Sequence, residues 1–362
     1  MAAWTPALAI PAFAQQTGQP CSQCHVGAFG PQLKPYGRDF KLFGYVNGDG
    51  QNNLPPIAIV GTASFTRTQK DQPGPPAPHL APNDNAVLDE LSLFYGGGLA
   101  AGAGAFAELT YDGVGHSITI DKLDIKRAFD LSSGDRSLVV GLDLNNQPTL
   151  QDLWNSTPAF GFPYSSSGLA PTPSAAVLFD GTLNQRVVGA GVYGMWNDLI
   201  YAEAEAYAPV DNRILGRLGV GTDADVYDGV TPYWRLAIQH DFDGHVLEAG
   251  VYGISARRFP AGDRSSGKDR IRDLALDATY QYTNSPRHFV SAHATWIHET
   301  QTLDASRVLS GSRPSDHLDS MRADVSYSYA DTWIPSVQVF RTLGSRDPAI
   351  FEGAGGKPDS EG

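Results

Sequence analysis

Cysteine is almost absent from this chain, with two residues in 362, and methionine is scarce, with three. Two thiols are too few for a disulfide framework, and no second C-x-x-C or C-x-x-H is present to complete a zinc tetrahedron. The sequence also lacks any run of about 18 apolar residues, which excludes a transmembrane helix. Basic residues are outnumbered, 26 Lys and Arg against 39 Asp and Glu, so we expect no nucleic-acid partner.

The two cysteines fall in one motif, Cys21-Ser22-Gln23-Cys24-His25. The C-x-x-C-H spacing is typical of c-type haem attachment, in which both thiols form thioethers and the histidine ligates the iron. Cys21 and Cys24 lie about one helical turn apart, so both can reach one edge of the macrocycle. A thiol redox pair is the alternative, but such pairs belong to a βαβ unit and this motif follows no strand. We therefore predict one covalent haem c, with Cys21, Cys24 and His25 as its site residues.

Residues 1–14 are apolar and rich in alanine, and small residues suited to cleavage lie near their end. This composition is typical of the tail of a secretory signal, although a basic n-region is missing. We interpret residues 1–14 as a signal-peptide remnant whose true start lies upstream. An ordinary flexible N-terminus is the alternative.

Residues 15–50 are predicted to form a monohaem cytochrome c segment with a short helix, because Tyr36, Phe40 and Phe43 recur at helical spacing. A segment of this length is too short for a cytochrome core of its own. We therefore expect the interior of the remaining chain to shelter the haem. Three cations of the segment are considered as partners of the haem propionates, with solvated side chains as the default: Lys34, Arg38 and Lys41.

The sixth ligand of the iron is not fixed by the sequence. Met195 and Met321 both lie in predicted strands, and Met321 falls on the predicted lipid face. His293 shares the predicted lumen face with Ser291 and Thr295, which makes it a weak candidate for the sixth ligand. A lumen histidine with no role at the iron is the alternative that we favour.

Residues 55–362 alternate with period two, which predicts antiparallel strands with one apolar and one polar face. Many of these strands reach ten residues, whereas ordinary strands have about five or six and a tilted membrane strand needs about nine to eleven. Aromatic residues gather near the strand ends, as in the interfacial girdle of a membrane barrel. About thirteen strands are predicted: 56–68, 86–97, 102–112, 116–130, 136–145, 185–196, 199–209, 232–242, 245–257, 270–283, 287–301, 317–329 and 332–343.

The connections alternate between short and long, with the short link at 113–115 as the exception. Outer-membrane barrels have short periplasmic turns and long extracellular loops. We therefore predict an all-β fold, a porin-like transmembrane antiparallel β-barrel over residues 55–362. The haem segment would lie on the periplasmic side or in the lumen. Because bacterial barrels normally have an even number of strands, we expect about 13 of 16 strands, with a truncated C-terminus inside an extracellular loop.

The longest predicted link, residues 146–184, is rich in aromatics, and a link of this length is unusual unless it has a role. Two alternatives for this link are left as equal: it folds back into the lumen as a constriction, or it packs on the barrel rim. Carboxylates are expected to line the lumen and to attract cations. Six of them are predicted to face inward: Asp143, Glu203, Glu205, Asp273, Asp277 and Asp324.

Residues 13–25, FAQQTGQPCSQCH, are followed by Phe29, by Tyr-Gly-Arg at 36–38 and by Gly-Tyr at 44–45, ahead of the predicted barrel. This arrangement resembles the outer-membrane monohaem cytochrome–porin fusions of iron-oxidising bacteria. The specific motif covers the first 45 residues, and the likeness of architecture covers nearly the whole chain, which is shorter than the family. The resemblance implies haem attachment at Cys21 and Cys24, with His25 as the proximal ligand. It also implies electron transfer from extracellular Fe(II) to a periplasmic cytochrome or other carrier, that is, Fe(II):cytochrome c oxidoreductase activity.

Three functions remain as hypotheses. The first is electron transfer across the bacterial outer membrane, with lipid around the barrel. The second is a diffusion porin whose haem segment acts as a plug or redox gate. The third is a soluble secreted all-β cytochrome. No acid–base pair or nucleophilic triad stands out, so we do not expect hydrolytic or covalent catalysis.

Overall fold

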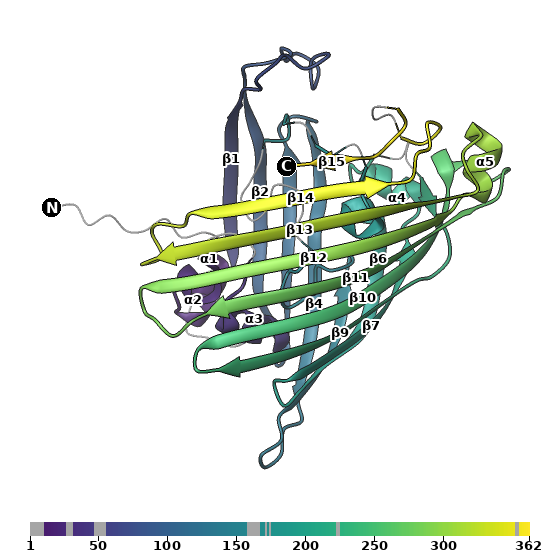
Figure 1. Ribbon diagram of the computed structural model, residues 1–362. Helices are drawn as coiled ribbons and strands as arrows, with labels where there is room; N and C mark the ends of the chain where they lie inside the picture. The colour runs from purple at the N-terminus through teal and green to yellow at the C-terminus, as the bar shows by residue number, and fades with distance from the viewer. Residues whose placement is uncertain are drawn as a thin grey trace.

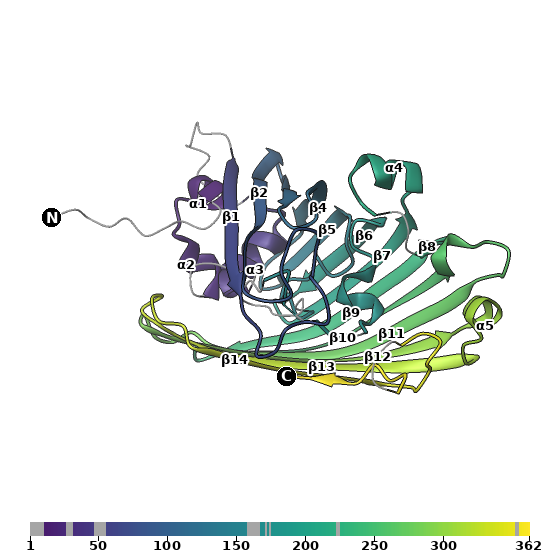
Figure 2. The same ribbon diagram turned by 90° about the horizontal axis from the view of Figure 1, so that it is seen from above.

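The computed structural model describes residues 11–26, 32–46, 56–157, 167–170, 172–173, 175–221, 225–351 and 355–362. Most of the predicted signal remnant, as well as Phe29, therefore lies outside the described residues. The described chain forms one strongly curved antiparallel sheet with three short N-terminal helices inside the curve (Figures 1 and 2). Among the described helices, none is long and apolar enough to cross a membrane.

The helices are α1 (Pro11–Thr17), α2 (Cys21–Cys24), α3 (Pro35–Leu42), α4 (Asn212–Arg217) and α5 (Asp304–Ser310). All thirteen predicted strands are present, with ends shifted by a few residues, and two further strands of two residues each, β8 and β15, were not predicted. The strands are β1 (Ile57–Thr66), β2 (Asn85–Ala100), β3 (Ala103–Asp112), β4 (Ser117–Asp130), β5 (Leu138–Asn145), β6 (Val187–Trp196), β7 (Ile200–Pro209), β8 (Val226–Tyr227), β9 (Thr231–Phe242), β10 (His245–Phe259), β11 (Asp269–Tyr282), β12 (His288–Thr302), β13 (Ser315–Tyr329), β14 (Ser336–Gly344) and β15 (Ser360–Glu361).

Each long strand pairs with the next one along the chain, and β8 adds to the end of β10. The predicted alternation of short and long connections is confirmed, because the turns after β2, β4, β6, β9, β11 and β13 are short. Three of these turns place both central residues in the left-handed region, as hairpins with a type I′ turn require. They are Asn197-Asp198, with φ of 52° and 51°, Asp243-Gly244, with φ of 49° and 77°, and Ala330-Asp331, with φ of 51° and 50°.

The sheet has two separate edges in the described chain, since β1 pairs with β2 alone and no pairing joins it to β14 or β15. The closed barrel that we expected is therefore not what the described residues form. The prediction that the last residues lie within a loop is wrong. Ser360 and Glu361 pair with Thr342 and Arg341 of β14, because this returning segment satisfies backbone groups at the strand edge.

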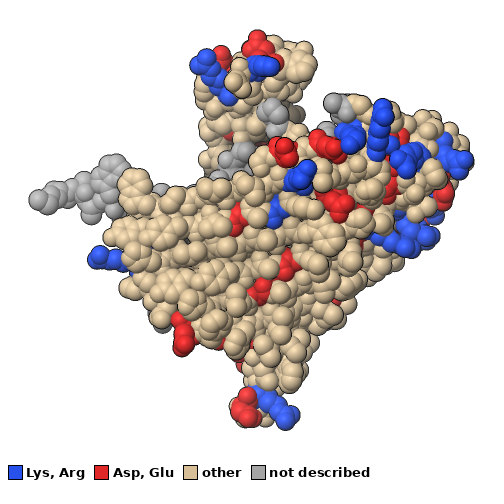
Figure 3. Space-filling model, viewed as in Figure 1, with Lys and Arg blue, Asp and Glu red and all other residues tan. Residues whose placement is uncertain are grey.

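The two faces of the sheet have the opposite polarity to those of a soluble sheet. On β11, Leu276 is 47% exposed, whereas the neighbouring Asp277 is 6% exposed. On β13, Val325 is 52% exposed and Asp324 is 5% exposed. All six carboxylates predicted to face inward are buried, which confirms that part of the pattern. Figure 3 shows the result, a broad outer face on which charged side chains are sparse, with basic residues gathered mainly at the end of the strands where α5 lies.

The long link between β5 and β6 folds into the interior of the sheet. Trp154 is fully buried, and its indole N–H donates to the Gln239 side chain at 3.0 Å. Phe179, later in the same link, packs edge-on against Tyr252 at 4.9 Å between ring centroids. The inward alternative is therefore confirmed for residues 146–157 and 175–184 of the predicted link. Residues 167–170 instead contact Thr66 at the end of β1 and Gln72 in the β1–β2 link, and 158–166, 171 and 174 lie outside the described residues.

Buried ion pairs hold the interior together. The guanidinium of Arg235 on β9 lies 2.9 Å from Glu248 and 2.7 Å from Asp277, while Lys126 pairs with Asp143. Carboxylates in a water-poor interior need such partners, because an unpaired buried charge is costly. In the described part of the chain, the predicted acidic lumen is thus a packed interior. Asp143 and Asp277 have cationic partners there, whereas Glu203, Glu205 and Asp273 accept hydrogen bonds from neutral groups.

Candidate haem-attachment site

The motif Cys21-Ser22-Gln23-Cys24-His25 forms one helical turn followed by an extended residue. Pro20 enters the turn with φ −67° and ψ 154°, and His25 leaves it with φ −113° and ψ 146°. The His25 amide donates to the Cys21 carbonyl at 2.9 Å, which closes the turn. Neither cysteine is in a disulfide. One turn therefore presents both thiols and the imidazole from a single short segment, as the spacing predicts.

Helix α3 holds this turn in place through backbone contacts. The Lys34 amide donates to the Cys24 carbonyl at 2.8 Å, and His25 bridges to Leu33. Gly37 packs so closely that a Cβ there would lie 2.5 Å from the Cys24 carbonyl oxygen. Only glycine allows this approach, so the position of the motif depends on the absence of a side chain at residue 37.

All three site residues line one cavity of about 330 Å³ inside the sheet. This volume lies within the range of about 300–1,000 Å³ that is typical of ligand pockets. The other walls are mainly apolar and come from α1, α3 and the strands β2 and β3. They include Phe13, Leu33, Phe40, Tyr45, Phe94, Phe106 and Leu150.

The aromatic walls pack against one another and leave one polar corner. Phe13 stacks on Tyr45 with 5.4 Å between ring centroids, and Phe94 stacks on Phe106 at 5.9 Å. The polar corner is formed by Lys122 on β4 and Glu108 on β3, whose charged groups lie 2.6 Å apart. An apolar cavity with two thiols, one imidazole and a nearby cation fits haem c, a flat apolar macrocycle with two carboxylates. Sequence reasoning missed Lys122 because only the strand pairing brings it to this cavity.

The three cations considered as propionate partners are held by protein groups instead, and none is simply solvated. Lys34 pairs with Asp331 at 3.1 Å. Arg38 donates to the Gln281 side chain at 2.6 Å, on the opposite wall of the sheet. Lys41 donates to the carbonyls of Leu150 and Asp152, both at 2.6 Å. Burial of Arg38 and Lys41 requires these partners, and the contacts tie the helical segment to the sheet and to the inner link.

The protonation of the thiols argues against a redox pair. Burial raises the pKa of the Cys24 thiol to about 11, and the neighbouring Cys21 adds to this effect. Redox-active cysteines need a lowered pKa, because the thiolate is the reactive form. Burial likewise lowers the pKa of Lys41 to about 8 and that of Arg38 to about 10.

His293 faces the interior, as predicted, but it does not line the cavity. Its Nδ1 lies 3.2 Å from the Asp324 carboxylate and 3.3 Å from the amide nitrogen of Gln32. Gln32 in turn donates to Asp324 at 2.7 Å. The structure thus brings Cys21, Cys24 and His25 together and places His293 in a separate polar cluster.

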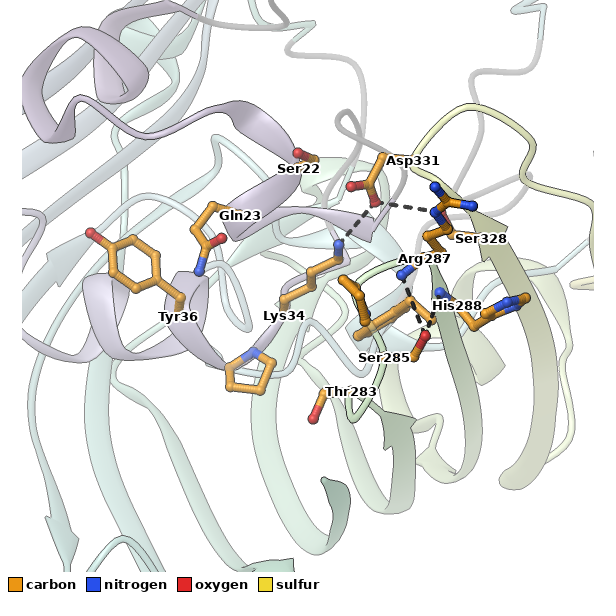
Figure 4. Close-up of a pocket in the computed structure, with 13 residues that line it drawn as sticks. Ser22, Gln23, Lys34, Tyr36, Thr283, Ser285, Arg287, His288, Ser328 and Asp331 are labelled. Carbon is orange, nitrogen blue, oxygen red and sulfur yellow. Dashed lines mark hydrogen bonds and ion pairs between the residues drawn. The ribbon is translucent and has the colours of Figure 1, made fainter. Parts of the chain in front are cut away.

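A second cavity of about 410 Å³ lies at the short-turn end of the sheet, beside the haem-attachment turn (Figure 4). Ser22 and Gln23, the two residues between the cysteines, form one wall. The turns after β11 and β13 form the other, with Arg287 and Asp331. Figure 4 shows Lys34 reaching across to Asp331, so this ion pair joins the helical segment to the sheet at the mouth.

No known family model matches this chain, and no curated protein matches its sequence. OmpTdeltaL8, a loop L8 deletion mutant of the Vibrio cholerae outer membrane protein OmpT, is 9% identical, with a TM-score of 0.35 over 80% of this chain and 92% of that chain. The outer membrane channel DcaP of Acinetobacter baumannii is 9% identical, with a TM-score of 0.35 over 84% of this chain and 94% of that chain. Likeness at this level decides neither fold nor function.

Proposed function

We propose that this chain is an outer-membrane c-type cytochrome–porin that transfers electrons from extracellular Fe(II) to a periplasmic carrier. The observation that carries the proposal is that Cys21, Cys24 and His25 all line one apolar cavity in the interior of the sheet. When bound there, haem c would supply one-electron redox chemistry. The cytochrome–porin family that the first 45 residues resemble provides the expectation for donor and acceptor.

The reversed polarity of the sheet supports a place in the outer membrane. An apolar outer face with a polar interior is the pattern of membrane barrels, and the opposite pattern is typical of soluble sheets. Backbone groups cannot stay unpaired in hydrocarbon. We therefore propose that the edges of β1 and β14 are both paired in the membrane, which makes the sheet a closed barrel surrounded by lipid.

The orientation follows from the connections, since outer-membrane barrels keep their short turns in the periplasm. The contacts of the helical segment lie near the short-turn ends of the strands, as with Lys34 and Asp331 of the β13–β14 turn. This arrangement would put the haem-attachment turn and the mouth cavity on the periplasmic side. A carrier docking at the mouth would meet Gln23, which is exposed between the two cysteines.

The residues of the cavity would set the properties of the haem. His25 would ligate the iron, and Cys21 and Cys24 would fix the orientation of the macrocycle. The aromatic walls around Phe94 and Phe106 would keep water away, and burial is one of the factors that set a haem potential.

The packed interior favours electron transfer over the diffusion-porin hypothesis. In the described part of the chain, Trp154, Tyr201 and Arg235 are fully buried between the walls of the sheet. Lys41 fastens the inner link to α3 by three hydrogen bonds, so the link and the helical segment would have to move together to open a channel.

The test is an absorption spectrum of the full-length protein, purified oxidised from outer membranes in detergent, before and after anaerobic addition of Fe(II). A c-type spectrum that changes to the reduced form supports the proposal. A haem reduced by dithionite but not by Fe(II) would keep the cytochrome and reject iron as the donor. The double variant Cys21→Ala/Cys24→Ala should lose the covalent haem, whereas Ser22→Ala, between the two attachment points, should keep it.

A further inference from the structure

The cavity that we assign to haem has one imidazole, that of His25. We propose that the iron receives no ligand beyond His25 from the described methionines and histidines, and that it binds a small external ligand in the cavity that Lys122 and Glu108 line. The ligands that fit are small anions and diatomic molecules. This inference rests on the proposed function, since it requires haem at Cys21 and Cys24.

The chain has three methionines, and neither of the two that are described lies at the cavity. Met321 lies on the apolar outer face of β13 and is 42% exposed. Met195 is buried in a cluster with Leu42, Trp154 and Tyr201, and it does not line the cavity. Met1 lies outside the described residues. No described methionine is therefore placed at the haem cavity.

All nine histidines are described, and of these only His25 lines the cavity. His293 is held by Asp324 and Gln32, away from the cavity. The other seven lie in the β1–β2 link, on the outer face or at strand ends, and none of them lines the cavity. His79 lies in the β1–β2 link, and His240 stacks on the ring of Phe242. The other five form hydrogen bonds with nearby side chains: His116 with Tyr111, His245 with Tyr280, His288 with Tyr327, His298 with Asp319 and His317 with Ser345.

Three other side chains that line the cavity, those of Tyr45, Lys41 and Lys122, are bound to other protein groups instead of being available to the iron. The Tyr45 hydroxyl donates to Asp124 at 2.5 Å. Lys41 uses its ammonium protons on carbonyl oxygens of the inner link. Lys122 pairs with Glu108 at 2.6 Å and with Asp121 at 3.3 Å, which favours the ammonium form, and an ammonium has no lone pair for iron. The described cavity therefore supplies one strong nitrogen ligand rather than two.

The same corner determines which ligand would bind. Two of the three Lys122 ammonium protons are directed at Glu108 and Asp121. The third can donate a hydrogen bond to an anion on the iron, and charge-assisted hydrogen bonds of this type are the stronger ones. The apolar rings of Phe94 and Phe106 also line the cavity, and they would accept an uncharged diatomic molecule. Cyanide on the ferric protein and carbon monoxide on the ferrous protein are therefore suitable probes.

The experiment uses the haem-loaded full chain in detergent. We expect a high-spin ferric spectrum by absorption and electron paramagnetic resonance, saturable binding of carbon monoxide to the ferrous form, and cyanide binding to the ferric form. Lys122→Met should weaken cyanide binding by about tenfold, which is about 1.4 kcal/mol, with little effect on carbon monoxide. Lys70→Met, an exposed lysine in the β1–β2 link, is the matched control and should leave both affinities unchanged.

A low-spin ferric haem that does not bind carbon monoxide would overturn the inference and leave the proposed function standing. Loss of that low-spin signal in Met195→Leu, His293→Ala or Lys122→Met would then identify the sixth ligand. A protein with no covalent haem would overturn the proposed function and this inference together. These two failures are distinguishable in the first spectrum.

Discussion

Replacing Gly37 by alanine tests whether close packing of α3 on the C-x-x-C-H turn positions the haem site. In an ordinary helix interior, alanine is more stable than glycine by about 0.5–1 kcal/mol. At residue 37, however, the added Cβ would lie 2.5 Å from the Cys24 carbonyl oxygen and 3.1 Å from its carbon. Both atoms are backbone, so no side-chain rotation relieves the contact. Gly37→Ala should therefore stabilise the protein if helix propensity decides, and destabilise it if close packing on Cys24 decides.

The size of the effect follows from the distance. Ordinary contact begins at 3.4 Å, so α3 and α2 must separate by about 0.9 Å, which also stretches the 2.8 Å hydrogen bond from Lys34 to Cys24. Overpacking of this kind costs about 1–3 kcal/mol. We expect Gly37→Ala to lower the thermal unfolding midpoint in detergent and to reduce the covalent haem per polypeptide.

Gly74→Ala is the matched control, because nothing lies within 4 Å of a Cβ at residue 74 in the β1–β2 link. Unfolding midpoint and haem content, measured by denatured-haem absorbance against total protein, should both match the wild type in this control. An unchanged or raised midpoint and full haem content in Gly37→Ala would refute the role of close packing.

Three further predictions concern the outer face, the interior and the thiols. Leu276→Arg puts a charge in the middle of an outward-facing strand, which costs about 2–4 kcal/mol in a membrane barrel; folded protein in the outer-membrane fraction should fall, and Leu276→Phe should not reduce it. Arg235→Met leaves Glu248 and Asp277 without their cation and should cost about 3–5 kcal/mol in thermal unfolding, whereas the exposed Arg270→Met should be neutral. In haem-free protein, the raised pKa of Cys24, from 9.0 to about 11, lowers the thiolate fraction at pH 7.5, so alkylation should be at least about tenfold slower than in the unfolded chain. The first prediction is contradicted if Leu276→Arg reaches the outer-membrane fraction as well as Leu276→Phe does. The second is contradicted if Arg235→Met unfolds at the same temperature as Arg270→Met, and the third if Cys24 is alkylated equally fast in the folded and the unfolded chain.

Period-two alternation and turn chemistry were enough to predict the sheet. The exposed Leu276 beside the buried Asp277 is the pattern that the sequence carries, and left-handed turns such as Asn197-Asp198 fix where strands reverse. These signals are local, because each depends on residues within one strand or one turn. The C-x-x-C-H motif is local as well, and it was found for the same reason.

The partners of the buried charges could not be predicted. Lys41 reaches the inner link more than 100 residues away, and Arg38 reaches Gln281 on the far wall. Lys122 joins the cavity that Cys21, Cys24 and His25 line because β4 pairs beside β3. Such contacts depend on which strands curve around the helical segment, and alternation within a strand carries no information about that.

The central claim is that haem is attached at Cys21 and Cys24 of an outer-membrane protein. The measurement that tests it most directly is mass spectrometry of peptides from the protein isolated in the outer-membrane fraction. We predict a peptide containing both cysteines that carries one haem through two thioethers. The same peptide with two unmodified thiols, from folded protein in that membrane, would contradict the claim.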